Sequence, residues 1–257
     1  MEIERTEVER LVIVTGGSSG LGKAILEALN AHGQDQLLVN IARRTASLEQ
    51  PLNAGNQLLN ISANLHESDN IDSAQQALSQ LIAAHSFKEA FIIHNAGQVT
   101  PVGMCHQLTD VSAIDNALRL NVSSVVALNA TFLQSVPAHC AQKVLLISSG
   151  AGRGPVSGWA VYGATKAALD YYAQVFHQEN PNIPCVSLAP GVIDTDMQAT
   201  IRAQDTDNFP PIERFLQLHR EQQLQSPKDT ARRIVRYLFS ATFGQQVIDD
   251  IRHHPAG

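Results

Sequence analysis

The amino-acid sequence predicts an α/β fold in which helices flank a Rossmann-like, doubly wound parallel sheet within a single domain spanning residues 1–257. Three observations support this prediction. Short apolar runs alternate along the chain with stretches long enough for helices. A glycine-rich turn follows the first of these runs. No internal repeat or low-complexity linker divides the 257 residues, of which 44% are hydrophobic, so we expect one core of α/β type.

The expected strands are short runs rich in Val, Ile and Leu. They span residues 11–14, 37–41, 57–61, 91–93, 143–147 and 185–188. Strands that are apolar throughout are buried on both faces, which is typical of a parallel sheet covered by helices. The expected helices span residues 22–31, 69–84, 111–135, 161–179 and 230–239. Crossover helices of this length connect parallel strands with a right-handed turn, and the ligand crevice then lies beyond the carboxyl ends of the strands.

The composition changes in the segment 198–228. Gln, Asp and Arg are frequent there, and Pro210 and Pro211 interrupt the alternation of strands and helices. Long insertions in compact domains are often functional, so we interpret this segment as a mobile substrate lid with one short helix. A solvated surface excursion without a role is the alternative.

Charge and composition exclude several classes of partner. The formal net charge is −6 and the 18 Lys and Arg residues are scattered, which disfavours nucleic acid. The first ten residues lack an apolar run behind a basic start, and no stretch reaches the roughly 18 to 20 apolar residues that span a membrane. The three cysteines, Cys105, Cys140 and Cys185, fit neither disulfide nor metal-ligand spacing and predict reduced packing residues. We therefore expect a cytoplasmic protein without a metal site.

A phosphate-binding turn is predicted where the first strand meets the first helix. Thr15 is followed by Gly-Gly-Ser-Ser-Gly-Leu-Gly, with the spacing Gly-x-x-x-Gly-x-Gly. Glycines let a pyrophosphate approach the backbone, and a helix amino terminus offers free N–H groups and a positive dipole end. The candidate cofactor residues here are Gly16, Ser18, Ser19, Gly20, Leu21 and Gly22. A turn that merely packs strand against helix is the alternative.

The end of the second strand indicates the type of cofactor. Arg43 and Arg44 follow Ile41-Ala42, and no acidic residue is present there. An acidic residue at this place holds the adenosine ribose hydroxyls, whereas Arg accommodates a 2′-phosphate. The pair therefore predicts NADPH or NADP+ as the cofactor, with simple surface solvation of the arginines as the alternative.

Three residues form a candidate proton-transfer site. Ser149 follows the strand 143–147, and Tyr162 and Lys166 lie four positions apart in a predicted helix, hence on one helical face. A nearby ammonium favours phenolate, so we expect Lys166 to lower the pKa of Tyr162 toward the useful acid/base range. Ser149 can then donate a hydrogen bond to a substrate carbonyl oxygen as negative charge grows on it.

These residues together resemble the short-chain dehydrogenase/reductase family, over the chain from Thr15 to at least Met197. The matching features are the glycine-rich turn, Asn95-Ala-Gly97, Asn121, Ser149, Tyr162-x-x-x-Lys166 and Pro190-Gly191. The resemblance implies that Tyr162 donates the proton, that Lys166 also binds the nicotinamide ribose, that Ser149 positions the carbonyl, and that Asn121 holds a relay water. It further implies two groups of cofactor contacts. Asn95, Ala96 and Gly97 would lie near the adenosine ribose, and Pro190, Gly191, Ile193 and Thr195 would face the nicotinamide.

Two stretches depart from the family pattern. Where the family usually has an acidic residue against adenine, this chain has Asn64 followed by Leu65, so an amide would make that contact. The Asp-Gly-Gly stretch of tetrameric members is replaced by residues 247–251. The resemblance and the long helices 111–135 and 161–179 suggest a homodimer.

Two segments, 158–166 and 189–198, look like the sepiapterin reductase and benzil reductase branch of the family. That likeness implies reduction of a carbonyl beside a second carbonyl or a conjugated ring. Asp249 or Asp250 would match an aspartate that anchors a pterin. Trp159 is either a packing residue or a substrate contact, because buried aromatic area serves both roles.

The leading hypothesis is an NADPH-dependent carbonyl reductase acting on a small-molecule ketone, either an α-dicarbonyl of the benzil type or a pterin-like compound. One alternative is an NADP-dependent alcohol or hydroxysteroid dehydrogenase that works in the oxidative direction. Arg43 and Arg44 argue against it, because they suit NADPH, which most cells keep in the reduced form. A second alternative is a non-catalytic NADP(H)-sensing protein. Such a sensor would be expected to lack Ser149, Tyr162 or Lys166, and all three are present.

Overall fold

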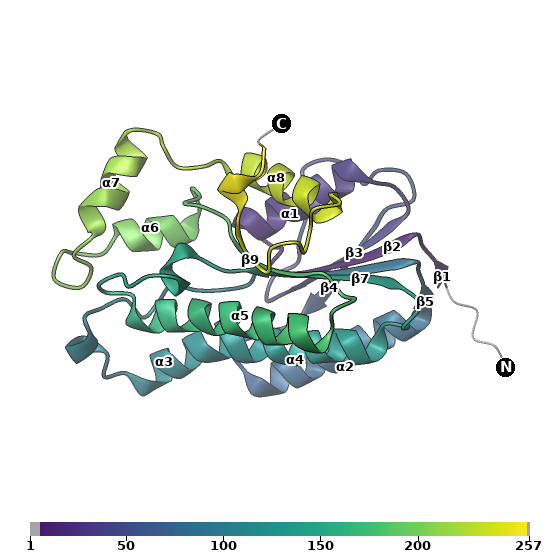
Figure 1. The fold of residues 1–257 in the computed structure, drawn as a ribbon, viewed down its shortest axis with the longest axis horizontal. Helices are drawn as coiled ribbons and strands as arrows, with labels where there is room; N and C mark the ends of the chain where they lie inside the picture. Colours follow the sequence, from purple (N-terminus) through teal and green to yellow (C-terminus); the bar gives the residue numbers. More distant parts are fainter. Residues whose placement is uncertain (1–5, 256–257) are drawn as a thin grey trace.

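A seven-stranded parallel sheet forms the centre of the computed structural model, which describes residues 6–255 (Figure 1). The strand order is β4-β3-β2-β6-β7-β8-β9. The strands are β2 (Arg10–Thr15), β3 (Gln36–Ala42), β4 (Gln57–Ser62), β6 (Glu89–His94), β7 (Ala141–Ile147), β8 (Cys185–Ala189) and β9 (Ile248–Asp250). A separate pair, β1 (Thr6–Glu7) and β5 (His85–Ser86), forms a small parallel sheet. The first ten residues, in which the sequence shows no apolar run behind a basic start, lie partly outside the described residues.

Helices cover both faces of the sheet, as the apolar runs predict. The α-helices are α1 (Gly20–His32), α2 (Ser68–Ala84), α3 (Val111–Leu118), α4 (Ser124–Ser135), α5 (Ala160–Glu179), α6 (Asp196–Arg202), α7 (Ile212–Arg220) and α8 (Pro227–Phe239). In Figure 1, α2, α4 and α5 lie on one face and α1 and α8 on the other. Leu11 and Ile13 of β2 pack in the first core, and Val12 and Val14 in the second. A strand buried on both faces cannot alternate polar and apolar residues, which explains its sequence.

The direction of strand addition reverses between β2 and β6. From β2 the chain builds outward through β3 and β4, then returns to place β6 against the other side of β2 and continues to β9. Loops at the carboxyl ends of β2 and β6 therefore leave toward opposite faces and open a crevice between them. The glycine-rich turn and the stretch 95–97 occupy this switch point.

Several element boundaries differ from the sequence predictions. The predicted helix 111–135 is α3 and α4 joined by a π-helical turn, Arg119–Ser123. Short 3-10 helices lie at Cys105–Gln107, Gly150–Gly152 and Ile251–His253. β9 was not predicted, because its three residues, Ile248 to Asp250, are mostly acidic. The last helix begins at Pro227, three residues early, because Ser226 accepts a hydrogen bond from Asp229 N and caps it.

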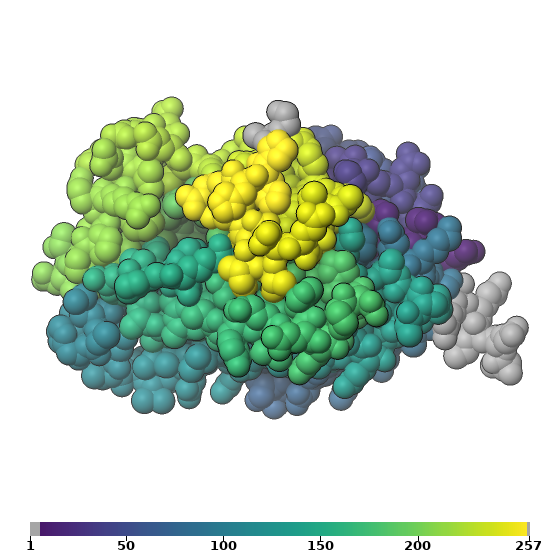
Figure 2. Space-filling model, viewed as in Figure 1, coloured from purple at the N-terminus to yellow at the C-terminus, as the bar shows by residue number. Residues whose placement is uncertain are grey.

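The segment 198–228 contains more helix than predicted. α6 begins before it at Asp196, α7 lies within it, and α8 begins inside its last residues. Figure 2 shows this part of the chain, in light green, projecting at one end of the molecule beside the C-terminal residues. The prediction of one short helix is wrong because apolar residues of α6 and α7, such as Ile201 and Phe215, pack in a third core together with Trp159.

Some predictions about the bulk properties can be compared with the described residues. No helix within residues 6–255 is both long and apolar enough to cross a membrane. The same residues contain no cluster of three His, Cys, Asp or Glu side chains suited to a metal ion. Cys140 and Cys185 are buried, as expected for packing residues, but Cys105 is exposed.

Candidate active site

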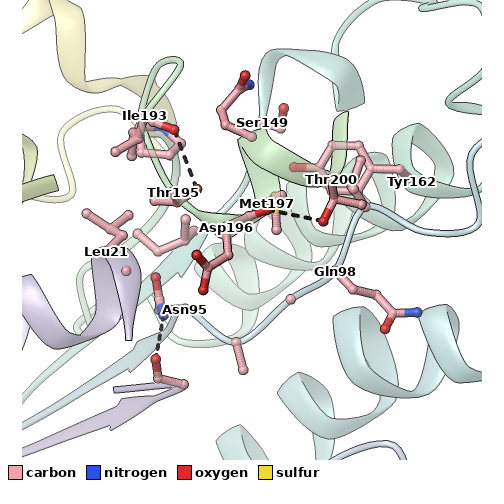
Figure 3. A pocket seen from close by; sticks show the side chains of 18 of the residues that line it. Leu21, Asn95, Gln98, Ser149, Tyr162, Ile193, Thr195, Asp196, Met197 and Thr200 are labelled. Atoms are coloured by element: carbon pink, nitrogen blue, oxygen red, sulfur yellow. Dashed lines mark hydrogen bonds between the residues drawn. The ribbon is translucent and has the colours of Figure 1, made fainter. Parts of the chain in front are cut away.

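A cavity of about 760 Å³ lies at the carboxyl ends of the strands. Figure 3 shows Leu21, Asn95 and Thr195 in one part of it and Tyr162 in another, with Met197 between them in this view. Nearly all the candidate residues line this cavity. They are Gly16, Ser18, Ser19, Gly20, Leu21, Arg43, Arg44, Asn64, Leu65, Asn95, Ala96, Gly97, Ser149, Tyr162, Lys166, Pro190, Gly191, Ile193 and Thr195. Gly22 and Asn121 are the two exceptions, and both lie behind the wall.

The glycine-rich turn is shaped by close backbone contacts. Gly16 has φ +70°, a conformation that other residues rarely adopt. A Cβ on Gly22 would lie 2.2 Å from the carbonyl oxygen of Gly16, so α1 can approach the turn only with glycine there. Gly22 therefore packs the helix against the turn and does not face the cavity.

The loop after β6 holds this turn in place. Thr15 Oγ1 accepts hydrogen bonds from the backbone N–H groups of Asn95 and Ala96, each at 3.0 Å. Asn95 Nδ2 donates back to the carbonyl oxygen of Thr15 at 3.1 Å. The stretch 95–97 is thus bound directly to the start of the glycine-rich turn.

Buried Asn40, which the sequence analysis missed, positions the arginine loop together with the exposed Asn60. Asn40 Oδ1 accepts from Gly17 N at 2.9 Å, while its Nδ2 donates to Asn60 Oδ1 at 2.8 Å and to the carbonyl oxygen of Arg44 at 3.2 Å. One side chain thereby connects the glycine-rich turn, β4 and the loop after β3. An Asn at the centre of an otherwise apolar strand is the sequence signal that could have indicated this role.

The two arginines are exposed at the rim of the cavity. Arg44 donates to Ser19 Oγ of the glycine-rich turn at 3.2 Å. Arg43 lies near His66, whose pKa is lowered chiefly by burial and further by this guanidinium. Both arginines thus present positive charge beside the turn.

Asn64 lies at the same end of the cavity. Its Nδ2 donates to Glu67 at 2.6 Å, and its Oδ1 is buried without a partner among the described residues. The side chain therefore has one free hydrogen-bond acceptor in the cavity wall.

Tyr162 and Lys166 lie one turn apart on α5, and both are buried, with 8% and 4% of their surface exposed. Lys166 Nζ donates to the carbonyl oxygen of Ile147 at 2.8 Å and lies 5.7 Å from the centre of the Tyr162 ring. Ser149 follows β7 and caps the short helix Gly150–Gly152, where its Oγ accepts from Ala151 N at 3.2 Å. The fold thus brings the hydroxyl, the phenol and the ammonium to one end of the cavity.

The acid/base properties of this group differ from the expectation. Burial raises the pKa of the Tyr162 phenol, and a hydrogen bond with Ser149 acts in the opposite direction. Burial also lowers the pKa of Lys166 to about 8, against the influence of the Asp170 carboxylate. The expected lowering of the Tyr162 pKa by Lys166 is therefore wrong for the protein alone, because exclusion of water disfavours phenolate and ammonium alike.

Asn121 lies in the π-helical turn and is fully buried. Its Nδ2 donates to the carbonyl oxygen of Gln98 at 2.9 Å and to Thr165 Oγ1 at 3.0 Å, and its Oδ1 accepts from Gln98 N at 2.9 Å. Both amide hydrogens are used within the protein. The side chain holds the loop after β6 against α5.

An aromatic cluster surrounds the phenol. Trp159 stacks on Phe209 with ring centres 4.8 Å apart, contacts Phe215 at 5.3 Å and meets Tyr162 edge-on at 5.5 Å. Gly158 lets the segment with Phe209 approach Trp159, because a Cβ on Gly158 would lie 2.6 Å from the carbonyl oxygen of Asn208. Trp159 therefore packs against the segment 198–228, and it also lines the cavity.

The structure separates the two C-terminal aspartates. Asp249 does not line the cavity. Its Oδ2 accepts a hydrogen bond from the Tyr237 hydroxyl at 2.8 Å and lies 2.8 Å from His254 Nε2. Asp250 lines the cavity, where Arg252 donates to both of its carboxylate oxygens at 2.8 and 2.6 Å. That arginine holds the pKa of Asp250 below its usual range.

A doubly wound sheet with a glycine-rich turn and a buried Tyr, Lys and Ser in one cavity defines a dinucleotide-dependent oxidoreductase. Residues 10–206 match the family model described as short chain dehydrogenase. The chain belongs to this family, whose members bind a nicotinamide cofactor and act on alcohol or carbonyl groups.

Named relatives extend over most of the chain. It is 30% identical over 247 residues to benzil reductase ((S)-benzoin forming) of Bacillus subtilis, covering 93% of this chain and 97% of that protein. It is 30% identical over 244 residues to sepiapterin reductase of Bos taurus, covering 91% of each. The crystal structure of the KRED1-Pglu enzyme is similar with a TM-score of 0.79 and 27% identity, covering 92% of this chain and 99% of that one.

Proposed function

We propose that this protein is an NADPH-dependent carbonyl reductase that transfers hydride to a ketone, and that its substrate is an α-dicarbonyl compound. One observation supports this proposal above the others. A single cavity is lined at one end by the glycine-rich turn with Arg43 and Arg44, and at the other by Ser149, Tyr162 and Lys166. A dinucleotide and a carbonyl compound can therefore meet within it.

The residues present fit a phosphorylated dinucleotide. Asn64 Oδ1 is a buried acceptor without a described partner, suited to an adenine amino group. Gly97 leaves room beside the ammonium, since a Cβ there would lie 3.6 Å from Lys166 Nζ, where a ribose hydroxyl could bind. Arg43 and Arg44 offer forked guanidinium donors for a 2′-phosphate. A reduced nicotinamide supplies the hydride when it is bound.

The protein residues manage the proton and the charge. Tyr162 is buried and protonated, so its hydroxyl donates a proton to the carbonyl oxygen as the alcohol forms. Ser149 donates a hydrogen bond to the same oxygen and stabilises its developing charge. Lys166 holds its ammonium beside the phenol and favours the phenolate that remains.

The surroundings of the phenol favour an aryl α-dicarbonyl over a pterin. Trp159, Phe215 and Ile201 are apolar and line this end of the cavity. Asp250 is the C-terminal carboxylate that could bind an amino-substituted ring, and Arg252 already occupies both of its oxygens. A flat apolar substituent therefore finds complementary surface, whereas a polar heterocycle must compete with an ion pair.

Three further proposals accompany this one. The segment 198–228 serves as a substrate lid, supported by the packing of Phe209 and Phe215 on Trp159. The protein forms a homodimer, supported by the exposed apolar side chains Val126 of α4 and Tyr171 of α5. A cytoplasmic location stays a prediction. Sedimentation analysis tests the dimer directly.

The decisive assay measures loss of NADPH absorbance in the near ultraviolet after addition of benzil, diketones, quinones or sepiapterin. We expect the fastest turnover with an aryl diketone and a strong preference for NADPH over NADH. Turnover only in the oxidative direction would favour an alcohol dehydrogenase. Tight NADPH binding without turnover of any carbonyl would favour a sensor.

A further inference from the structure

A buried carboxylate lies one helical turn beyond Lys166 on α5, outside the residues that line the cavity. Asp170 is 7% exposed, and each of its oxygens has a partner. Oδ1 accepts from Ser148 Oγ at 2.7 Å and from Ser187 Oγ at 2.6 Å, and Oδ2 accepts from Arg153 Nε at 3.1 Å. A carboxylate removed from water costs free energy unless it is paired, and here both oxygens are paired.

Two hydrogen bonds, one from Lys166 and one to Asp170, fix the end of β7 against α5. Lys166 Nζ binds the carbonyl oxygen of Ile147, and Asp170 binds the hydroxyl of the next residue, Ser148. Ser149 comes directly after them. Two adjacent strand residues are thus attached to two helix residues one turn apart, which sets the position of Ser149 relative to the helix that carries Tyr162.

The remaining contacts close the loop on its far side. Arg153 follows the short helix that Ser149 caps, and its guanidinium donates to Asp170 and to the carbonyl oxygen of Ser187 at 3.1 Å. Ser187 lies on β8, three residues before the loop that begins at Pro190. Asp170 therefore joins both ends of the Ser149 loop to the neighbouring strand.

We propose that Asp170 is a positioning residue, which holds Ser149 in register with Tyr162 and Lys166 and keeps a negative charge beside the buried ammonium. This inference rests on the proposed roles of those three residues in proton transfer. Displacement of a reacting group by about 1 Å can cost about 100-fold in rate, so a clamp of this kind affects turnover without touching substrate.

The charges around Asp170 are few among the described residues. Lys166 lies on the same helix and Arg153 on the loop. β9 also packs against α5, but its Asp249 and Asp250 have partners of their own. Burial lowers the pKa of Lys166 and Asp170 opposes that effect. Removal of the Asp170 charge therefore lowers the pKa of Lys166 further.

The test compares Asp170→Asn with Glu179→Gln, which removes the same charge from an exposed position on the same helix. For Asp170→Asn we expect kcat to fall about 10- to 100-fold. We also expect the alkaline limb of its pH profile to move about one unit toward lower pH, because Lys166 loses its proton earlier. Glu179→Gln should change neither quantity. An Asp170→Asn profile that matches Glu179→Gln would overturn the proposal.

A second variant separates position from charge and serves if Asp170→Asn does not fold. Ser148→Ala removes the hydrogen bond to Asp170, and a longer one to the carbonyl oxygen of Lys166, while the Asp170 side chain stays in place. We expect it to lower kcat several-fold, with the pH limb and the NADPH dissociation constant unchanged. Unchanged kcat in Ser148→Ala would refute the clamp.

A readout without turnover distinguishes failure of this inference from failure of the proposed function. The ammonium of Lys166 is titrated by NMR in ¹⁵N-lysine-labelled protein and assigned by comparison with Lys166→Arg. We expect the Lys166 ammonium to titrate at lower pH in Asp170→Asn than in the wild type. In Ser148→Ala we expect its titration to be unchanged. If wild-type protein reduces no carbonyl but this difference is present, the reductase proposal fails and the electrostatic role of Asp170 stands. Equal titration of wild type and Asp170→Asn would refute that role.

Discussion

The two ends of the cavity are built differently. At the reactive end, Tyr162 and Lys166 are almost completely buried, and Lys166 is held by a backbone carbonyl. At the other end, Arg43 and Arg44 are exposed, and the hydrogen bond of Arg44 to Ser19 is itself exposed to solvent. Geometry therefore dominates at the reactive end and charge at the other. Substitutions at the first should change chemistry, and substitutions at the second should change cofactor choice.

The largest effect is expected from Tyr162→Phe. The ring still packs against Trp159, but the proton donor is lost, so kcat should fall about 10²- to 10⁴-fold while NADPH affinity stays nearly the same. Steady-state kinetics and a fluorescence titration with NADPH measure the two quantities. Tyr172→Phe, on the same helix but outside the cavity, is the matched control. If Tyr162→Phe kept more than about a tenth of wild-type kcat with chemistry rate-limiting, Tyr162 would not be the acid.

Lys166→Ala should impair both cofactor binding and proton transfer. In the wild type, activity should decline as the pH rises through about 8, where Lys166 loses its proton. The variant lacks that group, and the remaining alkaline limb belongs to Tyr162, whose pKa is raised by burial, so the limb should move to higher pH. Lys143→Ala, which removes another lysine bound to a carbonyl oxygen, should show neither effect. Intact NADPH affinity in Lys166→Ala would contradict the ribose role.

The double variant Arg43→Ala, Arg44→Ala sharpens the comparison from the other end. Each charge-assisted hydrogen bond lost to the 2′-phosphate should weaken NADPH binding about 10- to 150-fold, since such bonds contribute about 1.5 to 3 kcal/mol. NADH lacks that phosphate, so the kcat/KM values of the two cofactors should become similar. We expect Arg43 to account for the larger share. Arg236→Ala, an exposed arginine on α8, is the control at the same ionic strength. A wild type that already prefers NADH would overturn the assignment.

The smallest effect is expected from Arg252→Ala, at the reactive end. Its ion pair with Asp250 is largely exposed on the arginine side, so turnover of benzil should stay within about fivefold of wild type. The freed carboxylate should instead improve the relative kcat/KM for sepiapterin. Competition between the two substrates in one assay measures the ratio. An unchanged ratio would remove Asp250 from substrate selection.

Local sequence patterns predicted most of the fold and named most of the candidate residues that the structure brings to one cavity. Continuous apolar runs predicted six strands of the main sheet, and the spacing of Tyr162 and Lys166 placed them on one helical face. β9 escaped prediction because its residues, Ile248 to Asp250, are too few and too polar to show a strand pattern. The segment 198–228 was expected to contain one short helix, whereas parts of both α6 and α7 lie in it. Apolar residues of the two helices, such as Ile201 and Phe215, are buried in a core with Trp159, and that packing arises only in the tertiary structure.

The sequence by itself determined the class of fold, the position of the glycine-rich turn and the choice of Tyr162 as candidate acid, because these depend on residues close together along the chain. Only the tertiary structure decided that Asn40 connects three segments, that Asp250 and not Asp249 faces the cavity, and that Asp170 joins the Ser149 loop to α5. The tertiary structure also decided that the pKa of Tyr162 is raised. Hydrogen bonds between distant segments and exclusion of water both arise from packing, and packing places side chains together that no local period relates.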